Sequence, residues 1–334
     1  MSAAGLKLRI GPHALAGRVL LAPMAGVTDA PFRALCREFG ATLTCGEMLS
    51  ADQSLWHTSK SRRRMALSDS GTGLRAVQLA GADPAQLAAA ARAQVDQGAQ
   101  LIDLNLGCPV KKVCNRLCGS ALLEDEPLVG RLLDALVRAV AVPVTVKIRT
   151  GPDPARRNAV RVAQLAEQCG VAAIAIHGRT RAERFSGRAE YATIRAVKSA
   201  VRIPVIANGE IATPQQARAV LQASGADALM IGRAALGTPW IFRDVNAFLD
   251  SAQIAPRLLR ASMATIILRH LESLYEFYGE YTGVRMARKH LVRYCEHHAD
   301  AGALRSALLA AEDSASQFAT AQRAFGEWSA AAAA

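Results

Sequence analysis

Short apolar runs alternate with longer stretches of helical periodicity over most of the chain. Apolar runs bounded by Gly, Pro or polar residues predict buried strands, whereas apolar residues spaced three and four apart predict helices. The predicted strands are 19–22, 42–45, 75–79, 101–105, 144–148, 173–177, 204–208 and 228–231. The predicted helices between them include 84–97, 128–140, 156–168, 191–200 and 214–223.

This alternation predicts an α/β fold, a (β/α)8 TIM barrel. Because helices separate the strands, consecutive strands are expected to pair in parallel. Eight strands within about 245 residues match the usual length of such a barrel. A doubly wound open sheet fits the same alternation and is the alternative.

A small all-helical domain is predicted after the barrel. Residues 249–258 have the character of a linker, and apolar residues beyond it repeat at helical spacing. We therefore divide the chain into a barrel at 1–247, a helical domain at 258–329 and a disordered tail at 330–334. One face of a helix in the second domain carries a basic stripe. Such a stripe is usually solvated, but it would contact phosphates if the partner were a nucleic acid.

Composition restricts the class of protein. Of the 334 residues, 51% are hydrophobic, which allows a large aliphatic core. No apolar run approaches the ~18 residues of a membrane span, and the first residues lack the layout of a secretory signal. Seven cysteines at irregular spacing favour a reducing cytoplasm over a disulfide framework. The cysteines and histidines do not show zinc-ligand spacing, so we expect no metal.

The charge is positive and unevenly distributed. The formal net charge is +12, and Lys and Arg outnumber Asp and Glu by 31 to 20 before Pro256 but by 9 to 8 after it. Basic clusters follow successive strands, and in a barrel they would form a ring on one rim that suits a polyanion. A merely soluble basic surface explains the composition equally well. The clusters are Lys60, Arg62, Arg63 and Arg64; Lys111, Lys112 and Arg116; Arg149, Arg156 and Arg157; Arg179, Arg181, Arg184 and Arg188.

Polar residues and glycines concentrate where the predicted strands end. In a barrel the carboxyl ends of all strands meet at one face, where active sites lie. In strand order, the residues placed there are Pro23, Met24 and Ala25; Glu47; Gln78; Cys108; Lys147 and Arg149; His177; Asn208, Gly209 and Glu210; Gly232 and Arg233.

Cys108 is the candidate for proton transfer. It follows the strand 101–105 in a Gly-Cys-Pro turn, where a thiol can give or take a proton beside a bound ligand. A buried, unreactive thiol is the alternative and the commoner role of cysteine. Lys147 can be a Schiff-base nucleophile or a fixed charge beside an electron-rich ring. His177 can be a core residue or a substrate contact.

Two turns that contain glycine predict a phosphate site. In barrels, phosphate groups often bind the loops after the seventh and eighth strands, where backbone N–H groups converge. Gly209 and Gly232 allow that approach and Arg233 adds a charge, so we expect a phosphorylated cofactor. Residues 71–76 superficially match a dinucleotide fingerprint. They precede a strand instead of opening a helix, and we therefore expect no Rossmann-type nicotinamide site.

The ordered motifs of the chain resemble those of the tRNA-dihydrouridine synthases, in particular the bacterial B subfamily. The motifs are APMAGVTDAPFR, VQLAG, DLNLGCPVKKV, GSALL, VKIRTG, IHGRTR, VIANGEI and DALMIGRAALGTPWIF. The resemblance implies an FMN-binding barrel followed by a helical tRNA-binding domain. The implied FMN contacts are Pro23, Met24 and Ala25 under the ring, Gln78 and Lys147 at its polar edge, His177 beside it, and Asn208, Gly209, Glu210, Gly232 and Arg233 at the ribitol and phosphate.

The resemblance also implies an activity, the reduction of tRNA D-loop uridines to 5,6-dihydrouridine with NADPH or NADH as reductant. Hydride would reach C6 of uracil through the flavin, and Cys108 would protonate C5 as general acid. The expected tRNA contacts are Asn105, Lys111, Lys112, Arg149, Arg179, Arg285, Arg288, Lys289 and Arg293. The sequence pattern predicts no role for Cys114 and Cys118. We expect a monomer.

Three other functions remain open at this point. An FMN-dependent reductase of a small molecule, of the ene or dihydroorotate type, would share the barrel and the cofactor but would not need a basic rim. A non-catalytic RNA-binding barrel, or an aldolase that forms a Schiff base on Lys147, would be colourless when purified.

Overall fold

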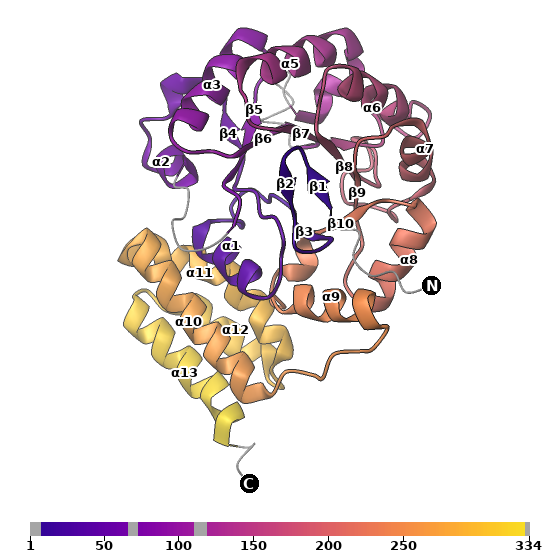
Figure 1. Ribbon diagram of the computed structural model, residues 1–334. Coiled ribbons are helices and arrows are strands. Elements are labelled where there is room, and N and C mark those ends of the chain that lie inside the picture. The colour runs from indigo at the N-terminus through magenta and orange to yellow at the C-terminus, as the bar shows by residue number, and fades with distance from the viewer. Residues whose placement is uncertain (1–7, 66–72, 110–118, 331–334) are drawn as a thin grey trace.

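The computed structural model describes residues 8–65, 73–109 and 119–330. Its centre is an eight-stranded parallel sheet in which neighbouring strands follow chain order (Figure 1). A doubly wound sheet would reverse that order at a switch point, so the predicted barrel architecture is confirmed. The strands are β3 (Val19–Leu21), β4 (Leu49–Ser50), β5 (Ala76–Ala80), β6 (Leu101–Leu106), β7 (Val144–Arg149), β8 (Ala173–His177), β9 (Val205–Asn208) and β10 (Ala228–Ile231).

Residues 41–45 connect the two ends of this sheet. The backbone N–H of Leu21 in β3 donates to the carbonyl of Leu43 (2.9 Å), and single bridges join the same segment to β3 and β5. The sequence predicts a continuous strand at 42–45, and this prediction is wrong. Because the segment crosses from β3 to β5, it pairs with each at single positions, and the strand β4 lies further along the chain.

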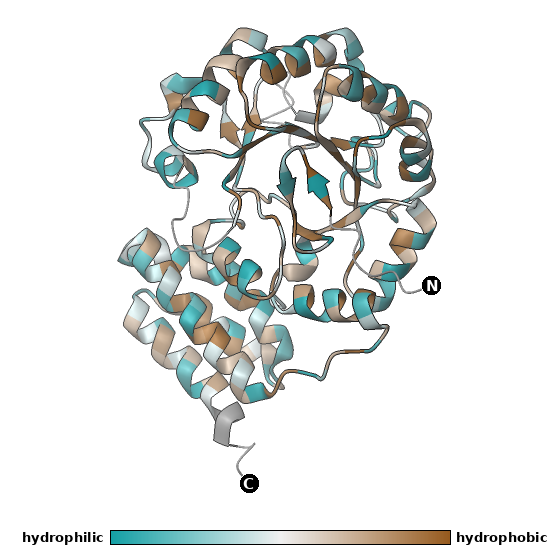
Figure 2. Ribbon diagram, viewed as in Figure 1, coloured by the Kyte–Doolittle hydropathy of each residue, from teal (hydrophilic) through white to brown (hydrophobic). Residues whose placement is uncertain are grey.

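Helices cover the outside of the barrel (Figure 1). They are α1 (Ala30–Glu38), α2 (Ser59–Met65), α3 (Pro84–Asp96), α5 (Glu126–Ala139), α6 (Ala159–Gln168), α7 (Ala192–Ala200), α8 (Pro214–Ser224) and α9 (Ile241–Ser251). Asp29, Asp83, Asp125 and Thr213 cap α1, α3, α5 and α8 by accepting a backbone N–H, and each of these helices has a proline in its first turn. Figure 2 shows the apolar strands enclosed by helices with hydrophilic outer faces.

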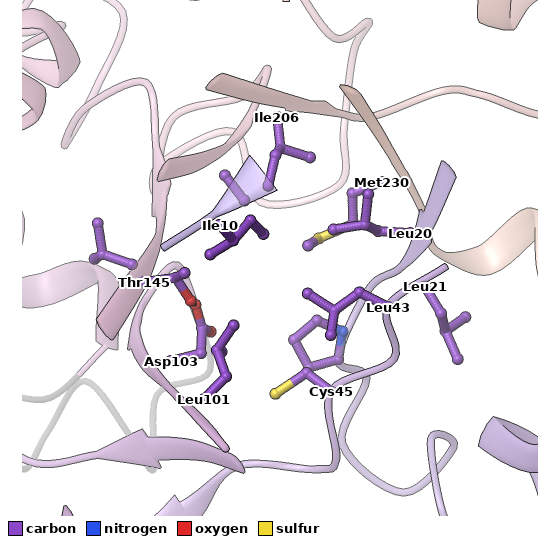
Figure 3. A pocket seen from close by; sticks show the side chains of 13 residues that line it. Ile10, Leu20, Leu21, Leu43, Cys45, Leu101, Asp103, Thr145, Ile206 and Met230 are labelled. Carbon is purple, nitrogen blue, oxygen red and sulfur yellow. The ribbon is translucent and has the colours of Figure 1, made fainter. Parts of the chain in front are cut away.

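A two-stranded hairpin, β1 (Arg9–Ile10) and β2 (His13–Ala14), lies across the barrel, and the sequence did not predict it. The hairpin places the fully buried Ile10 inside the barrel. Ile10 lines a cavity of about 20 Å³, which has room for about one water molecule. Figure 3 shows that apolar side chains line this cavity except where Asp103 and Thr145 meet.

A helical region follows α9: α10 (Arg260–Tyr278), α11 (Glu280–Tyr294), α12 (Ala301–Ala310) and α13 (Ser314–Ala330). It has its own core, in which Ile267, Leu271 and Leu291 are fully buried. Leu35 of α1 belongs to the same cluster, and α10 packs against α1 (Figure 1). The predicted helical region after the barrel is therefore confirmed. Within the described ranges, no helix combines the length and apolarity needed to cross a membrane.

Candidate active site

The backbone around Cys108 is fixed by hydrogen bonds on both sides. Asn105, near the end of β6, accepts the N–H groups of Gly107 (3.1 Å) and Cys108 (3.0 Å) on its side-chain oxygen. Ser120 donates its hydroxyl to the Cys108 carbonyl (2.9 Å). The half-buried Cys108 thus stands in a defined backbone setting at the carboxyl end of the barrel.

A buried chain of polar side chains orients Asn105. Asn105 donates its amide to Gln78 (2.8 Å), and Gln78 donates to the carboxylate of Asp103 (2.7 Å). Thr145 donates to the other carboxylate oxygen (2.6 Å). These residues stand on the adjacent strands β5, β6 and β7, and burial raises the pKa of Asp103. Because Gln78 holds the amide group of Asn105, the Asn105 oxygen faces the Cys108 turn.

Lys147 stands two residues after Thr145 on β7 and faces the barrel interior with it. Burial, followed by the charge of Arg149, lowers the pKa of Lys147 to about 8. The charge of Asp103 acts in the opposite direction. Within the described part of the chain, its ammonium group has no hydrogen-bond acceptor or ion-pair partner. A half-buried cation in this setting is typical of a binding site.

His177, at the end of β8, is a neutral imidazole. Burial lowers its pKa to about 2, and the neighbouring cations Lys147, Arg149, Arg179 and Arg233 add to this effect. Its Nδ1 is buried and lacks a hydrogen-bond partner among the described residues. A buried nitrogen without a partner costs free energy unless a ligand satisfies it.

The ends of β9 and β10 pack closely on their surroundings. Gly209 has φ +128°, and a Cβ there would meet Ala189 at 2.9 Å and His177 at 3.4 Å, so only glycine fits. Glu210 bonds Arg179 and accepts the N–H of Ala189 (3.0 Å). Asn208 donates to the Met230 carbonyl (2.7 Å). The carboxylate of Glu210 is therefore already engaged by protein groups.

The loops after β3 and β10 approach each other at Met24. A Cβ on Gly232 would lie 3.7 Å from the Met24 sulfur, which is ordinary contact. The hydroxyl of Thr28 accepts the N–H of Met24 (2.9 Å) and so fixes the turn after Pro23 and Met24. Glu47 supports this turn by accepting the N–H of Gly26 (2.6 Å). Residues 23–25 and 232 thus border one surface.

Phe185 is a residue that sequence analysis missed. It lies in the loop after β8, where its side chain is 56% exposed although it is apolar. The Arg149 and Arg233 guanidinium groups lie 5.4 and 5.1 Å from its ring centre, and the His177 ring centre is 6.5 Å away. An aromatic residue within an Arg-rich loop was the available signal.

Two of the arginines expected to contact RNA are buried. Arg149 donates to backbone carbonyls of the loops after β6 and β8, and Arg179 donates to the carbonyls of Ser186 and Gly187 as well as to Glu210. One further nitrogen of Arg179 is buried without a partner in the described part of the chain. Both side chains thus hold loops at the carboxyl end of the barrel.

The basic stripe on α11 divides into two groups. Arg285, Lys289 and Arg293 are exposed, and Lys289 reaches the barrel by donating to the Gly26 carbonyl (3.0 Å). Arg288 is half-buried and donates to the Ala311 carbonyl (2.9 Å). The stripe thus lies next to the loop that carries Met24. The expected contacts Lys111 and Lys112, with Cys114 and Cys118, lie outside the described residues.

Comparison with known proteins gives a consistent set of relatives. A family model described as "Dihydrouridine synthase (Dus)" matches residues 20–329. The chain is 52% identical over 320 residues to tRNA-dihydrouridine synthase B of Pseudomonas aeruginosa, covering 96% of each chain. It is also 52% identical over 310 residues to the Escherichia coli protein of that name, covering 93% of this chain and 96% of the other.

Solved structures support the fold. Histamine dehydrogenase from Rhizobium sp. 4-9 matches with a TM-score of 0.57 at 15% identity, covering 79% of this chain and 50% of that one. The 6-hydroxypseudooxynicotine amine oxidase of Pseudomonas geniculata N1 matches equally well, with a TM-score of 0.57, covering 78% and 52%. At this identity the match concerns the fold alone.

Proposed function

Because the chain belongs to the dihydrouridine synthase family, we propose that it reduces D-loop uridines of tRNA to 5,6-dihydrouridine, with FMN as cofactor and Cys108 as general acid. The observation that carries the proposal is the fixed turn of Cys108 at the carboxyl end of the barrel. Lys147 and His177 stand on the next two strands, each with a polar atom that has no partner among the residues the structure describes. Relatives named tRNA-dihydrouridine synthase B align over nearly their full length.

The residues at the strand ends fit FMN. The ammonium group of Lys147 and Nδ1 of His177 have no partner within residues 8–65, 73–109 and 119–330, and both suit the polar edge of a flavin. Gln78 has its oxygen and one N–H engaged by Asn105 and Asp103, and in the described part of the chain its second N–H has no acceptor and can serve a ligand. When bound, FMN supplies hydride transfer from a nicotinamide nucleotide, which we propose to be NADPH, to uracil.

The phosphate of FMN would lie at the ends of β9 and β10. Gly209 packs its backbone on Ala189 and His177, Gly232 lies beside Met24, and Arg233 begins a short helical turn with its charge. Pro23, Met24 and Ala25 would lie against the ring. Asn208 and Glu210 are bonded to protein groups, so we assign them to the support of these turns.

Cys108 would protonate C5 of the uracil ring. A general acid must reach its target through a fixed geometry, and the Asn105 and Ser120 hydrogen bonds supply that geometry. The uridine must first leave the RNA stack, which costs a few kcal/mol. The exposed ring of Phe185 offers a surface on which a base or a neighbouring nucleotide can stack.

The tRNA would bind the exposed stripe of Arg285, Lys289 and Arg293. The basic helix α2 lies beside it, because Arg63 donates to the carbonyl of Tyr278 at the end of α10 (3.3 Å). Together they extend a positive surface from the helical region to the barrel. For Arg149 and Arg179, whose bonds go to protein groups, we replace the expected RNA contact by a supporting role.

The proposal is tested by Cys108→Ala in the flavin-loaded protein. We expect the variant to keep its yellow cofactor and its oxidation of NADPH, but to lose uridine reduction by about 10² to 10⁴-fold, the usual contribution of a general acid. Cys169→Ala, at the half-buried thiol that ends α6 and donates to the Gly130 carbonyl of α5, is the matched control and should keep full activity. Full uridine reduction by Cys108→Ala would refute the role of this thiol.

A further inference from the structure

Arg149 ends β7, yet its side chain is only 2% exposed. Its Nε donates to the carbonyl of Gly107 (2.8 Å), and its Nη1 donates to the carbonyls of Thr180 (2.8 Å) and Arg184 (2.7 Å). Gly107 immediately precedes Cys108, and Arg184 immediately precedes Phe185. One guanidinium group therefore holds the peptide units before both of these residues.

We propose that Arg149 is a positioning residue that fixes the thiol of Cys108 and the ring of Phe185 relative to each other. This inference rests on the proposed function, because it assumes that the thiol acts on a base held beside the ring. Arg149 has no direct contact with the reacting atoms in this assignment. It acts through the two backbone carbonyls.

The peptide between Gly107 and Cys108 depends on Arg149 at one end. Its N–H is held by Asn105 (3.0 Å), whereas its carbonyl is held by the guanidinium of Arg149 (2.8 Å). A Cβ on Gly107 would lie 3.4 Å from the carbonyl oxygen of Lys147, so the turn lies directly against β7. Without Arg149, the carbonyl of this peptide loses its guanidinium donor, and its orientation relative to β7 is less tightly fixed.

The backbone of the loop that carries Phe185 is also held by Arg149. Arg184 has φ +51°, a left-handed conformation that a residue with a side chain adopts at a cost. The Arg149 bond to the Arg184 carbonyl holds this conformation, and the guanidinium lies 5.4 Å from the Phe185 ring centre. The planar fork of arginine reaches both loops at once, which the single ammonium group of lysine cannot do.

A positioning role and an RNA-contact role predict different kinetics. Loss of a phosphate contact weakens tRNA binding and reduces its salt dependence. Loss of positioning slows the chemical step while binding is retained, since misplacement by about 1 Å can cost on the order of 10²-fold in rate.

The test compares Arg149→Lys and Arg149→Met with Arg161→Met, an exposed α6 arginine paired with Glu126. The full-length, flavin-loaded proteins are pre-reduced, and single-turnover uridine reduction, the tRNA Kd and the alkylation rate of Cys108 by iodoacetamide are measured. We expect Arg149→Lys and Arg149→Met to lose uridine reduction on the order of 10²-fold, with tRNA Kd within about twofold and a changed alkylation rate. Arg161→Met should match the unsubstituted protein.

The following outcomes would overturn the inference or the proposed function on which it rests. A full single-turnover rate in either Arg149 variant overturns it, and so does a weakened Kd with an unchanged rate, which would indicate a phosphate contact. If Arg149→Met does not fold, Arg149→Lys decides alone, and an unchanged alkylation rate there also overturns the proposal. If the unsubstituted protein reduces no uridine at all, the proposed function itself fails, whatever the variants do.

Discussion

At the scale of single residues, the site depends on the half-buried Lys147 and the buried His177, two bases with different charge states. Burial is the largest cause of both shifts, lowering the pKa of Lys147 to about 8 and that of His177 to about 2. At neutral pH, Lys147 is therefore mostly charged and His177 is neutral. One residue offers a positive charge to the ligand, and the other offers an imidazole that can donate or accept a hydrogen bond.

Flavin binding should therefore weaken with rising pH. The charged form of Lys147 predominates below about pH 8, and if that form holds FMN, the Kd should rise above this pH by up to about tenfold per pH unit. Fluorescence titration of the flavin-free protein measures this. Lys147→Met should bind FMN weakly and show no inflection near pH 8. Lys198→Met breaks a half-buried pair with Asp227, which precedes β10, and should keep the inflection. An unchanged inflection in Lys147→Met would show that a group other than Lys147 controls the pH dependence of FMN binding.

At the scale of elements, the junction of α1 and α10 joins the barrel to the helical region. Asp29 caps α1 by accepting the N–H of Phe32 (3.0 Å), and its other oxygen accepts the hydroxyl of Tyr278 (3.1 Å). Burial is the main cause that raises the pKa of Asp29 to about 6. The carboxyl group is thus most stabilising when protonated, although it lies in a position that favours an acceptor.

This junction gives a pH-dependent stability. A pKa raised from 3.8 to about 6 on folding contributes stability below pH 3.8 that is lost as the pH rises through 6. Asp29→Asn keeps a capping oxygen but cannot ionise, so from pH 4 to pH 7 its stability should rise relative to the unsubstituted protein. The expected change is up to about 3 kcal/mol.

Denaturant unfolding at both pH values measures the change. Asp83→Asn, at the exposed cap of α3, is the control and should show a much smaller change. If the difference in unfolding free energy between Asp29→Asn and the unsubstituted protein is the same at pH 4 and pH 7, the account is contradicted.

The regular elements follow from sequence because their signals are local. The strand at 173–177 and the proline-started helix at 84–97 need only periodicity and a cap, and the structure confirms both within a residue. The segment 42–45 and the β1–β2 hairpin depend on partners distant in the chain, which no local pattern reveals. The same reason applies to Arg149. Its position at a strand end was predictable, but the three carbonyls that it holds belong to other loops.

At the scale of the whole molecule, exposed basic side chains of the helical region lie next to a basic helix of the barrel. The exposed α11 arginines and the basic helix α2 lie on the side where the helical region meets the barrel (Figure 1). The charge of +12 would attract a polyanion over the Debye length, about 8 Å at physiological salt. This arrangement suits an RNA substrate better than a small neutral molecule.

Salt dependence measures how many of these charges contact phosphate. We expect log Kd for tRNA to depend steeply on log salt, and Arg285→Gln or Arg293→Gln to lower the slope by about one each. Arg138→Gln, an exposed arginine in the last turn of α5, should leave the slope unchanged. A substrate affinity indifferent to salt would favour a small-molecule reductase instead.

The central claim is tested most directly by mapping dihydrouridine in tRNA from a strain that lacks this chain. We predict that specific D-loop positions lose dihydrouridine, that the unsubstituted chain restores it, and that Cys108→Ala does not, although it accumulates to the same level. Dihydrouridine that persists at every position in the deletion strain, or that Cys108→Ala restores in full, would contradict the account.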